Sequence, residues 1–168
     1  MIQKEYVVQA ARYSAWQNNQ LRGIVQNMDE ADVKADRGAF FGSIFATLNH
    51  ILWGDTLWMS RWCSDVCPPD AGADHTSFTS TIEVWDKERF RMDGRIRIWA
   101  ETLLNMDLRG DLEWYSQSAG MTFTQPLALC VTHMFNHQTH HRGQISQMLS
   151  AAGIPPPVSD LVYMPEDA

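Results

Sequence analysis

Apolar side chains recur every three or four residues in four long stretches of the chain, the spacing of one face of an α-helix. Each stretch is about 25 residues long, so four helices packed side by side would bury their apolar faces against one another. The predicted fold class is therefore all-α, a four-helix bundle. The predicted helices occupy approximately residues 3–28, 39–63, 80–105 and 124–152.

Local signals indicate where these helices begin and end. Proline lacks an amide hydrogen and clashes with a continuing helix, so the second helix is expected to end before the proline pair that begins at Pro68. Ser80 and Glu83 have the spacing of a capping box, which predicts the start of the third helix. Thr124 is the predicted N-cap of the fourth helix, and Gly153 predicts its end.

The segments between the predicted helices differ in character. Residues 29–38 are charged and poor in large apolar side chains, and residues 64–78 are rich in Asp, Pro, Gly and Ser, so we expect a connector and a loop. Between residues 107 and 124 the helical period is lost on both sides of a turn sequence that begins at Ser118. This pattern predicts a short β-hairpin or an extended crossover between the third and fourth helices. The tail after Val158 is expected to be extended.

Length and composition indicate a single domain that spans residues 1–168, because a chain of this length with 45% hydrophobic residues can bury a core. The formal net charge of −7 argues against a nucleic-acid partner, because phosphate binding needs clustered Lys and Arg.

No apolar run approaches the roughly 18 residues of a membrane span, and no signal peptide is recognisable.

The chain has three cysteines, which cannot all pair with one another, and a reducing cytoplasm is the expected location. Cys63 and Cys67 lack the C-x2-C spacing of zinc ribbons, so no zinc role is predicted for them.

Three histidines are the main candidates for chemistry. His137 and His141 are four residues apart on the fourth predicted helix, so they share a face with Cβ atoms roughly 5–6 Å apart. Two imidazoles at this spacing suit one divalent metal, whose bonds to nitrogen are about 2.0–2.1 Å long. His50, on the second predicted helix, would complete three ligands and leave the open position typical of catalytic sites. Gly54 follows one turn later and weakens the helix, which indicates a need for space.

A purely structural interpretation also fits these residues, because a single histidine on an apolar helix face is more often a hydrogen-bonded core residue than a metal ligand. Gln138 occupies the position of the general base in H-E-x-x-H, which disfavours that kind of metalloprotease chemistry. His133 and Gln144 share the face of the histidine pair, whereas His140 lies about 100° around the helix from His141 and does not easily serve the same site.

The segment Asn136–Gln144, with the sequence NHQTHHRGQ, closely resembles the C-terminal signature of the DinB-like family. Three other segments of the chain look similar to the same family, so the resemblance covers nearly the whole chain. These segments are Tyr13–Asn18, Leu48–Asp55 and Ile154–Leu161.

The resemblance implies a four-helix bundle that often forms homodimers and binds zinc or nickel through three histidines. By their positions in the motifs, these would be His50, His137 and His141. Some relatives transfer low-molecular-weight thiols or isomerise thiol adducts, which implies a thiol cosubstrate and a small-molecule substrate. The family name does not imply DNA binding, in agreement with the acidic charge.

We therefore expect a metal-dependent enzyme whose open coordination position activates a thiol or water. Gln144 or His133 would orient a ligand or substrate, with Asn49 and Asp55 as weaker candidates. The resemblance alone ranks S-transferase chemistry above metal-dependent hydrolysis.

Two other classes of function stay open at this point. One is a non-catalytic metal-binding or small-ligand-binding dimer, in which a protein group such as His133 fills the fourth metal position. The other is a purely structural bundle in which the histidines are hydrogen-bonded to protein groups.

Overall fold

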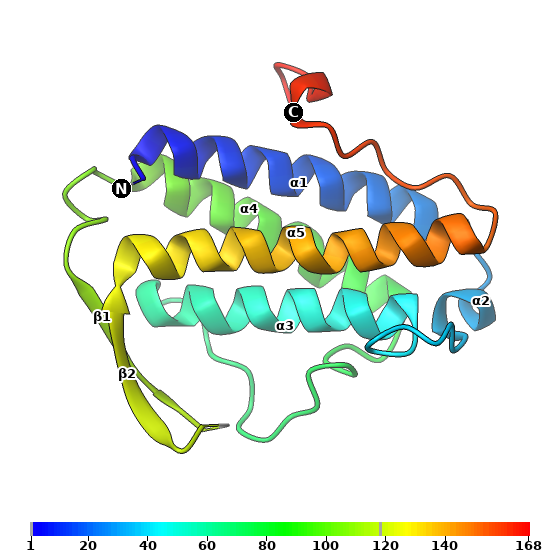
Figure 1. Cartoon of the computed structure of the whole chain (residues 1–168), viewed down its shortest axis with the longest axis horizontal. Helices are drawn as coiled ribbons and strands as arrows, with labels where there is room; N and C mark the ends of the chain where they lie inside the picture. Colours follow the sequence, from blue (N-terminus) through cyan, green and yellow to red (C-terminus); the bar gives the residue numbers. More distant parts are fainter. Residues whose placement is uncertain (1, 118) are drawn as a thin grey trace.

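The computed structural model of the chain describes residues 2–117 and 119–168, and this part of the chain is mostly helical (Figure 1). In these described residues, four long helices and one short helix alternate with loops, a two-stranded sheet and a single 3-10 turn. The elements in chain order are α1 (Lys4–Gln26), α2 (Glu30–Lys34), α3 (Ile44–Trp62), α4 (Ile82–Thr102), β1 (Asp111–Ser116), β2 (Met121–Pro126), α5 (Leu127–Ala151) and η1 (Leu161–Tyr163).

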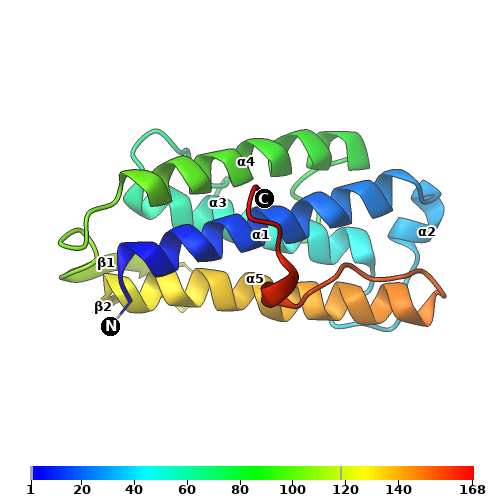
Figure 2. The same cartoon turned by 90° about the horizontal axis from the view of Figure 1, so that it is seen from above.

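The four long helices lie side by side, and each contacts two of the others: α1 packs on α4 and α5, and α3 packs on the same two helices. Figures 1 and 2 show this arrangement from two sides. The mostly helical class is confirmed. The short helix and the sheet mean that the architecture is more than a bundle of four helices.

The apolar core has two parts, one toward each end of the long helices. Leu21, Leu48 and Trp85 belong to the cluster nearer α2. Ala11 and Met59 belong to the other cluster, nearer the sheet. Between the two clusters, all four long helices place buried polar side chains. The position of this polar layer explains why the helices have polar interruptions in otherwise apolar faces.

The helix ends agree in part with the sequence signals. Thr81 caps α4, since its hydroxyl oxygen accepts a hydrogen bond from the Val84 amide at 3.3 Å; this is one residue after Ser80. Gly153 follows α5 with a φ of 73°, a conformation that glycine adopts without strain. The predicted N-cap Thr124 is wrong: this residue pairs with Glu113 in the sheet, and α5 begins only at Leu127.

The connector predicted at residues 29–38 contains the short helix α2, which the sequence pattern did not predict. Val33 supplies its anchor, because this side chain is fully buried in the core. Lys34 and Glu30 form an ion pair one turn apart. One buried side chain and one ion pair give too weak a periodic signal to predict a helix.

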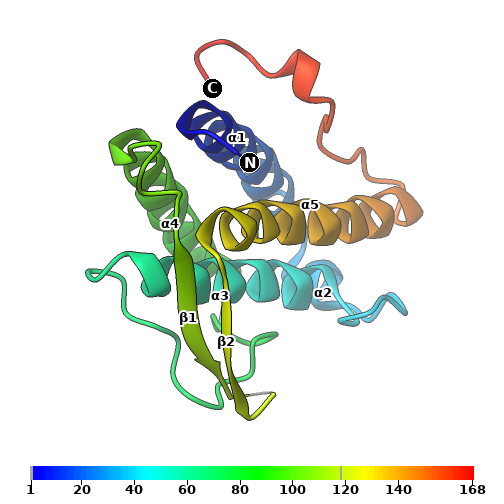
Figure 3. The same ribbon diagram turned by 60° about the vertical axis from the view of Figure 1, so that its left-hand side comes forward.

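The predicted hairpin is confirmed: β1 and β2 form an antiparallel pair in which Trp114 lies opposite Phe123. Ser118, in the predicted turn, lies outside the described residues. Figure 3 shows the hairpin crossing α3 and extending beyond it, away from the long helices. Trp114 packs against Trp58 of α3, with ring centroids 5.5 Å apart, and this contact ties the hairpin to the helices.

The C-terminal tail returns along α1 (Figure 2). Its backbone is held by side chains of that helix: Gln20 both donates to and accepts from Val158, and the Tyr13 hydroxyl donates to the Ser159 carbonyl at 2.6 Å. The tail is therefore attached mainly through its backbone, which leaves Val162 86% exposed. No helix in the described part of the chain combines the length and apolar character needed to cross a membrane.

Candidate metal centre

The packing of α3 against α5 brings His50 to the pair His137 and His141. One ring nitrogen from each histidine lies within 4.8 Å of the corresponding nitrogens of the other two. The Nε2 atoms of His50 and His137 are 2.9 Å apart, and the His137 and His141 ring centroids are 4.4 Å apart. Two distant segments of the sequence therefore form one cluster of three imidazoles, which is compatible with binding a divalent metal.

Gly54 leaves the space that the His137 ring occupies. A Cβ atom at position 54 would lie 3.1 Å from Cε1 and 3.5 Å from Nδ1 of His137. The first distance is shorter than ordinary van der Waals contact, so a larger residue would displace the ring or the helix. The predicted need for space at Gly54 thus corresponds to a close contact with one of the three histidines.

Gln144 fixes the orientation of His141. The Nδ1 atom of His141 lies 2.8 Å from Oε1 of Gln144, and a carbonyl oxygen only accepts hydrogen bonds. Nδ1 of His141 therefore carries the proton, and the lone pair is on Nε2. This is the tautomer that coordinates a metal through Nε2.

The three imidazoles are neutral at neutral pH. Burial lowers the pKa of His50 to about 3, with further lowering by the neighbouring His137, His141 and His75. Burial, and then the neighbouring His141, lowers the pKa of His137 to about 4. Burial also lowers the pKa of His141. Neutral imidazoles are the form that binds metals, so the cluster needs no proton release before coordination.

His133, the other candidate on the same helix face, lies beside the cluster and is not part of the three-histidine group. Its ring centroid is 5.9 Å from that of His137 and 5.2 Å from that of Trp58. Burial and then Arg61 lower the pKa of His133. The structure thus places His133 against Trp58, next to the cluster.

Asn49 and Asp55, the weaker candidates, make their hydrogen bonds elsewhere. Asn49 is fully buried, and its Oδ1 accepts hydrogen bonds from the amide and hydroxyl of Thr79, at 2.7 and 2.8 Å. Asp55 is also fully buried and binds Arg89 and Gln138. Adjacent helix residues point about 100° apart, so neighbours of His50 and Gly54 in sequence need not share their site.

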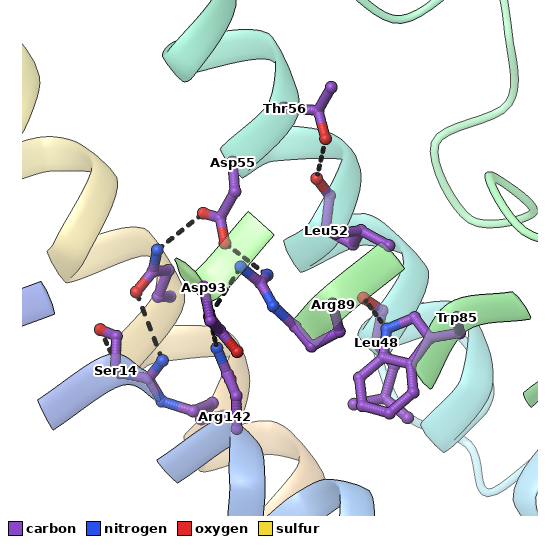
Figure 4. Close-up of polar contacts among 11 residues, drawn as sticks. Ser14, Leu48, Leu52, Asp55, Thr56, Trp85, Arg89, Asp93 and Arg142 are labelled. Atoms are coloured by element: carbon purple, nitrogen blue, oxygen red, sulfur yellow. Dashed lines mark hydrogen bonds and ion pairs between the residues drawn. The ribbon is translucent and has the colours of Figure 1, made fainter. Parts of the chain in front are cut away.

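Asp55 belongs to the layer of buried polar groups between the long helices (Figure 4). Arg89 is at the centre of this layer and contacts Asp55 at 2.6 Å and Asp93 at 2.8 Å. Gln138 donates to Asp55 at 2.8 Å, and Arg142 donates to Gln138 at 3.4 Å. Arg89 thus pairs directly with both buried aspartates, and Arg142 joins the layer through Gln138.

Two further side chains at the cluster, those of Phe41 and His75, were not predicted from the sequence. The ring of Phe41 covers the cluster, with centroids 4.3 Å from His50 and 5.3 Å from His141. The Nδ1 of His75, in the loop between α3 and α4, is 2.9 Å from the Nδ1 of His50. The second predicted helix (39–63) wrongly included Phe41: α3 begins only at Ile44, so Phe41 lies in the segment before it, whereas His75 lies in a loop without helical periodicity. The short sequence from Asp74 to Ser77, which favours an ordered turn, was the available signal.

The fold and the cluster together define a mostly helical protein with three neutral imidazoles arranged suitably for a divalent metal. The sequence profile of the DinB family matches residues 1–168, so the chain belongs to the DinB family. A search of curated protein sequences found no significant match.

Proposed function

We propose that this DinB-family protein is a metal-dependent enzyme that holds zinc or nickel through His50, His137 and His141. The observation that carries this proposal is the convergence of three ring nitrogens within 4.8 Å. Three protein ligands leave a position open for a substrate, as in catalytic metal sites. We further propose that the four long helices act as a four-helix bundle that holds the ligands on two facing helices.

A divalent cation with an open position lowers the pKa of a bound thiol or water and so supplies a nucleophile at neutral pH. The residues of this chain would perform the remaining tasks. Gln144 holds the proton on Nδ1 of His141, and Gly54 leaves room for His137. Phe41 covers one side of the cluster and limits water, which strengthens polar interactions at the site.

We propose transfer of a low-molecular-weight thiol to a small electrophilic substrate as the reaction. The donor set supports a soft or borderline metal such as zinc or nickel, which binds thiolates well. The resemblance to the family supports thiol transfer over hydrolysis and a homodimer. We also propose the reducing cytoplasm as its location. The three cysteines are all free, which agrees with a reducing compartment.

A non-catalytic metal-binding protein is the second candidate, and the position of Phe41 favours it. A ring 4.3 Å from His50 and 5.3 Å from His141 restricts access to the cluster. If Phe41 stays in place, a metal would bind but a substrate would not reach it.

Metal analysis and activity together test the proposal. Purified protein reconstituted with zinc or nickel should hold about one ion per chain, as expected for one three-histidine site. The double variant His137→Ala, His141→Ala should lose this metal, whereas the control His140→Ala, outside the cluster, should keep it. Equal metal content in the double variant would disprove the metal site.

The loaded enzyme is then assayed with thiols plus electrophilic acceptors and, separately, with esters and amides. Thiol-dependent turnover supports the proposed reaction. Turnover of hydrolytic substrates alone would replace it with a hydrolase, and bound metal without any turnover would favour the second candidate.

A further inference from the structure

The loop between α3 and α4 is attached to α3 through two neighbouring residues of that helix. Asn49 accepts hydrogen bonds from the amide and hydroxyl of Thr79, at 2.7 and 2.8 Å. The next residue, His50, has its Nδ1 atom 2.9 Å from Nδ1 of His75. His75 is therefore held beside one of the three clustered histidines by a loop that is fixed in the buried interior at Thr79.

The position of His75 within the loop is also fixed locally. Oδ1 of Asp74 accepts hydrogen bonds from the amide of Thr76 at 2.8 Å and from its hydroxyl at 2.7 Å. Oδ2 of Asp74 accepts a hydrogen bond from the hydroxyl of Ser77 at 3.0 Å. These bonds form a closed turn around His75, so its imidazole is presented to His50 in a defined orientation.

The two Nδ1 atoms can form a hydrogen bond only if one carries a proton and the other a lone pair. Nε2 of His50 faces the cluster, because it lies 2.9 Å from Nε2 of His137. Coordination through Nε2 leaves the proton of His50 on Nδ1. His75 must then be the acceptor, with its own proton on Nε2.

We propose that His75 is a positioning residue that accepts a hydrogen bond from Nδ1–H of His50 and holds Nε2 of His50 toward the metal. This inference rests on the metal site of the proposed function and adds a residue to it. The pair His141 and Gln144 has the same design, with an Nδ1–H donated to a fixed acceptor at 2.8 Å. Such partners fix the tautomer and ring orientation of a ligand and increase its affinity for metal.

Aromatic rings flank this hydrogen bond, and its two histidines are half-buried. The Phe41 ring lies 4.3 Å from that of His50 and 5.4 Å from that of His75. Trp53 is stacked on His50 at 6.2 Å and lies 5.6 Å from His75. A hydrogen bond between aromatic neighbours is stronger than the same bond in water, so its loss should be measurable.

Zinc competition titrations on the full chain test the role of His75. His75→Phe keeps a planar ring but removes the acceptor, and it should weaken zinc binding by about 10–100-fold. His75→Asn should restore much of the affinity, because its Oδ1 occupies nearly the same place as the Nδ1 of histidine. Thr79→Val removes a hydrogen bond of the loop that does not involve the imidazole, so its effect should be much smaller.

Nitrogen-15 spectra of the zinc-loaded protein supply a readout that a merely structural role would not change. In the wild type, Nδ1 of His50 should be protonated and Nε2 metal-bound, while Nδ1 of His75 should be an unprotonated, metal-free acceptor. Circular dichroism confirms that each variant is folded.

Three results would overturn the proposal: unchanged zinc affinity in His75→Phe, an equal loss in Thr79→Val, or a metal-bound nitrogen on His75. These results differ from failure of the metal site itself. In that case the double variant His137→Ala, His141→Ala would bind zinc as tightly as the wild type.

Discussion

Two neighbouring regions of this protein handle buried polar groups in opposite ways. On α5, His137 and His141 point to the histidine cluster, whereas the residues that directly follow them, Gln138 and Arg142, point into the polar layer between the long helices. The same helix therefore supplies both regions through adjacent residues, since neighbours on a helix point about 100° apart.

The polar layer satisfies its charges internally. Arg89 is 1% exposed, and it contacts Asp55 at 2.6 Å and Asp93 at 2.8 Å. The histidine cluster instead brings together groups of one kind, whose burial and mutual repulsion lower the pKa values of His50 and His137 to about 3 and 4. A region whose charges are paired within the protein is structural. A region whose ring nitrogens converge is suited to a metal ligand set.

Breaking the polar layer should have the largest effect on stability. Arg89→Ala leaves two buried carboxylates without their cation, so the free energy of unfolding should fall by about 3–5 kcal/mol. Urea unfolding measures this loss. Arg95→Ala is the matched control, because Arg95 pairs with the exposed Asp65 and its removal should change little. Equal unfolding midpoints for Arg89→Ala and the wild type would contradict the structural role of the layer.

Acid should destabilise the metal-free protein through the histidine cluster. The folded-state pKa values of His50 and His137, about 3 and about 4, lie below the ordinary value of 6.5. Between these limits the unfolded chain binds more protons than the folded protein, so stability is complete above about pH 6.5 and is lost as the pH falls toward 4.

Unfolding curves from pH 8 to pH 4, in the presence of a chelator, check this expectation. Their slope against pH should be smaller for His50→Ala and for His137→Ala than for the wild type. Identical slopes in the wild type and both variants would show that the cluster does not contribute.

The smallest expected effect is that of Gly54→Ala, which should act on the histidine cluster and leave the polar layer unchanged. A Cβ atom there meets His137 at 3.1 Å, so zinc affinity should fall. The helix itself should gain up to about 1 kcal/mol, since Ala favours a helix over Gly. Gly94→Ala, on α4 with nothing within 4 Å of its Cβ position, should give the helix gain with unchanged zinc affinity. Equal zinc affinity in both variants would mean that the ring of His137 moves freely.

Apolar periodicity and turn residues predicted the long helices, the hairpin and the end of α5 at Gly153, because these depend on local backbone preferences. The same local logic misplaced the N-cap at Thr124 and missed α2, whose helix depends on burial of Val33 against distant helices. Spacing alone identified His137 and His141 as a pair, since four residues on a helix define one face.

Only the tertiary structure decided which other residues join that pair. The packing of α3 on α5 brings His50 within reach, while the helix rotation turns Asn49 and Asp55 to other partners. The loop that carries His75 has no periodicity, so its approach to His50 depends on contacts between residues far apart in the sequence. Local sequence thus determined the helices, the hairpin and the histidine pair on one face of α5. Packing between helices determined which other residues join that pair.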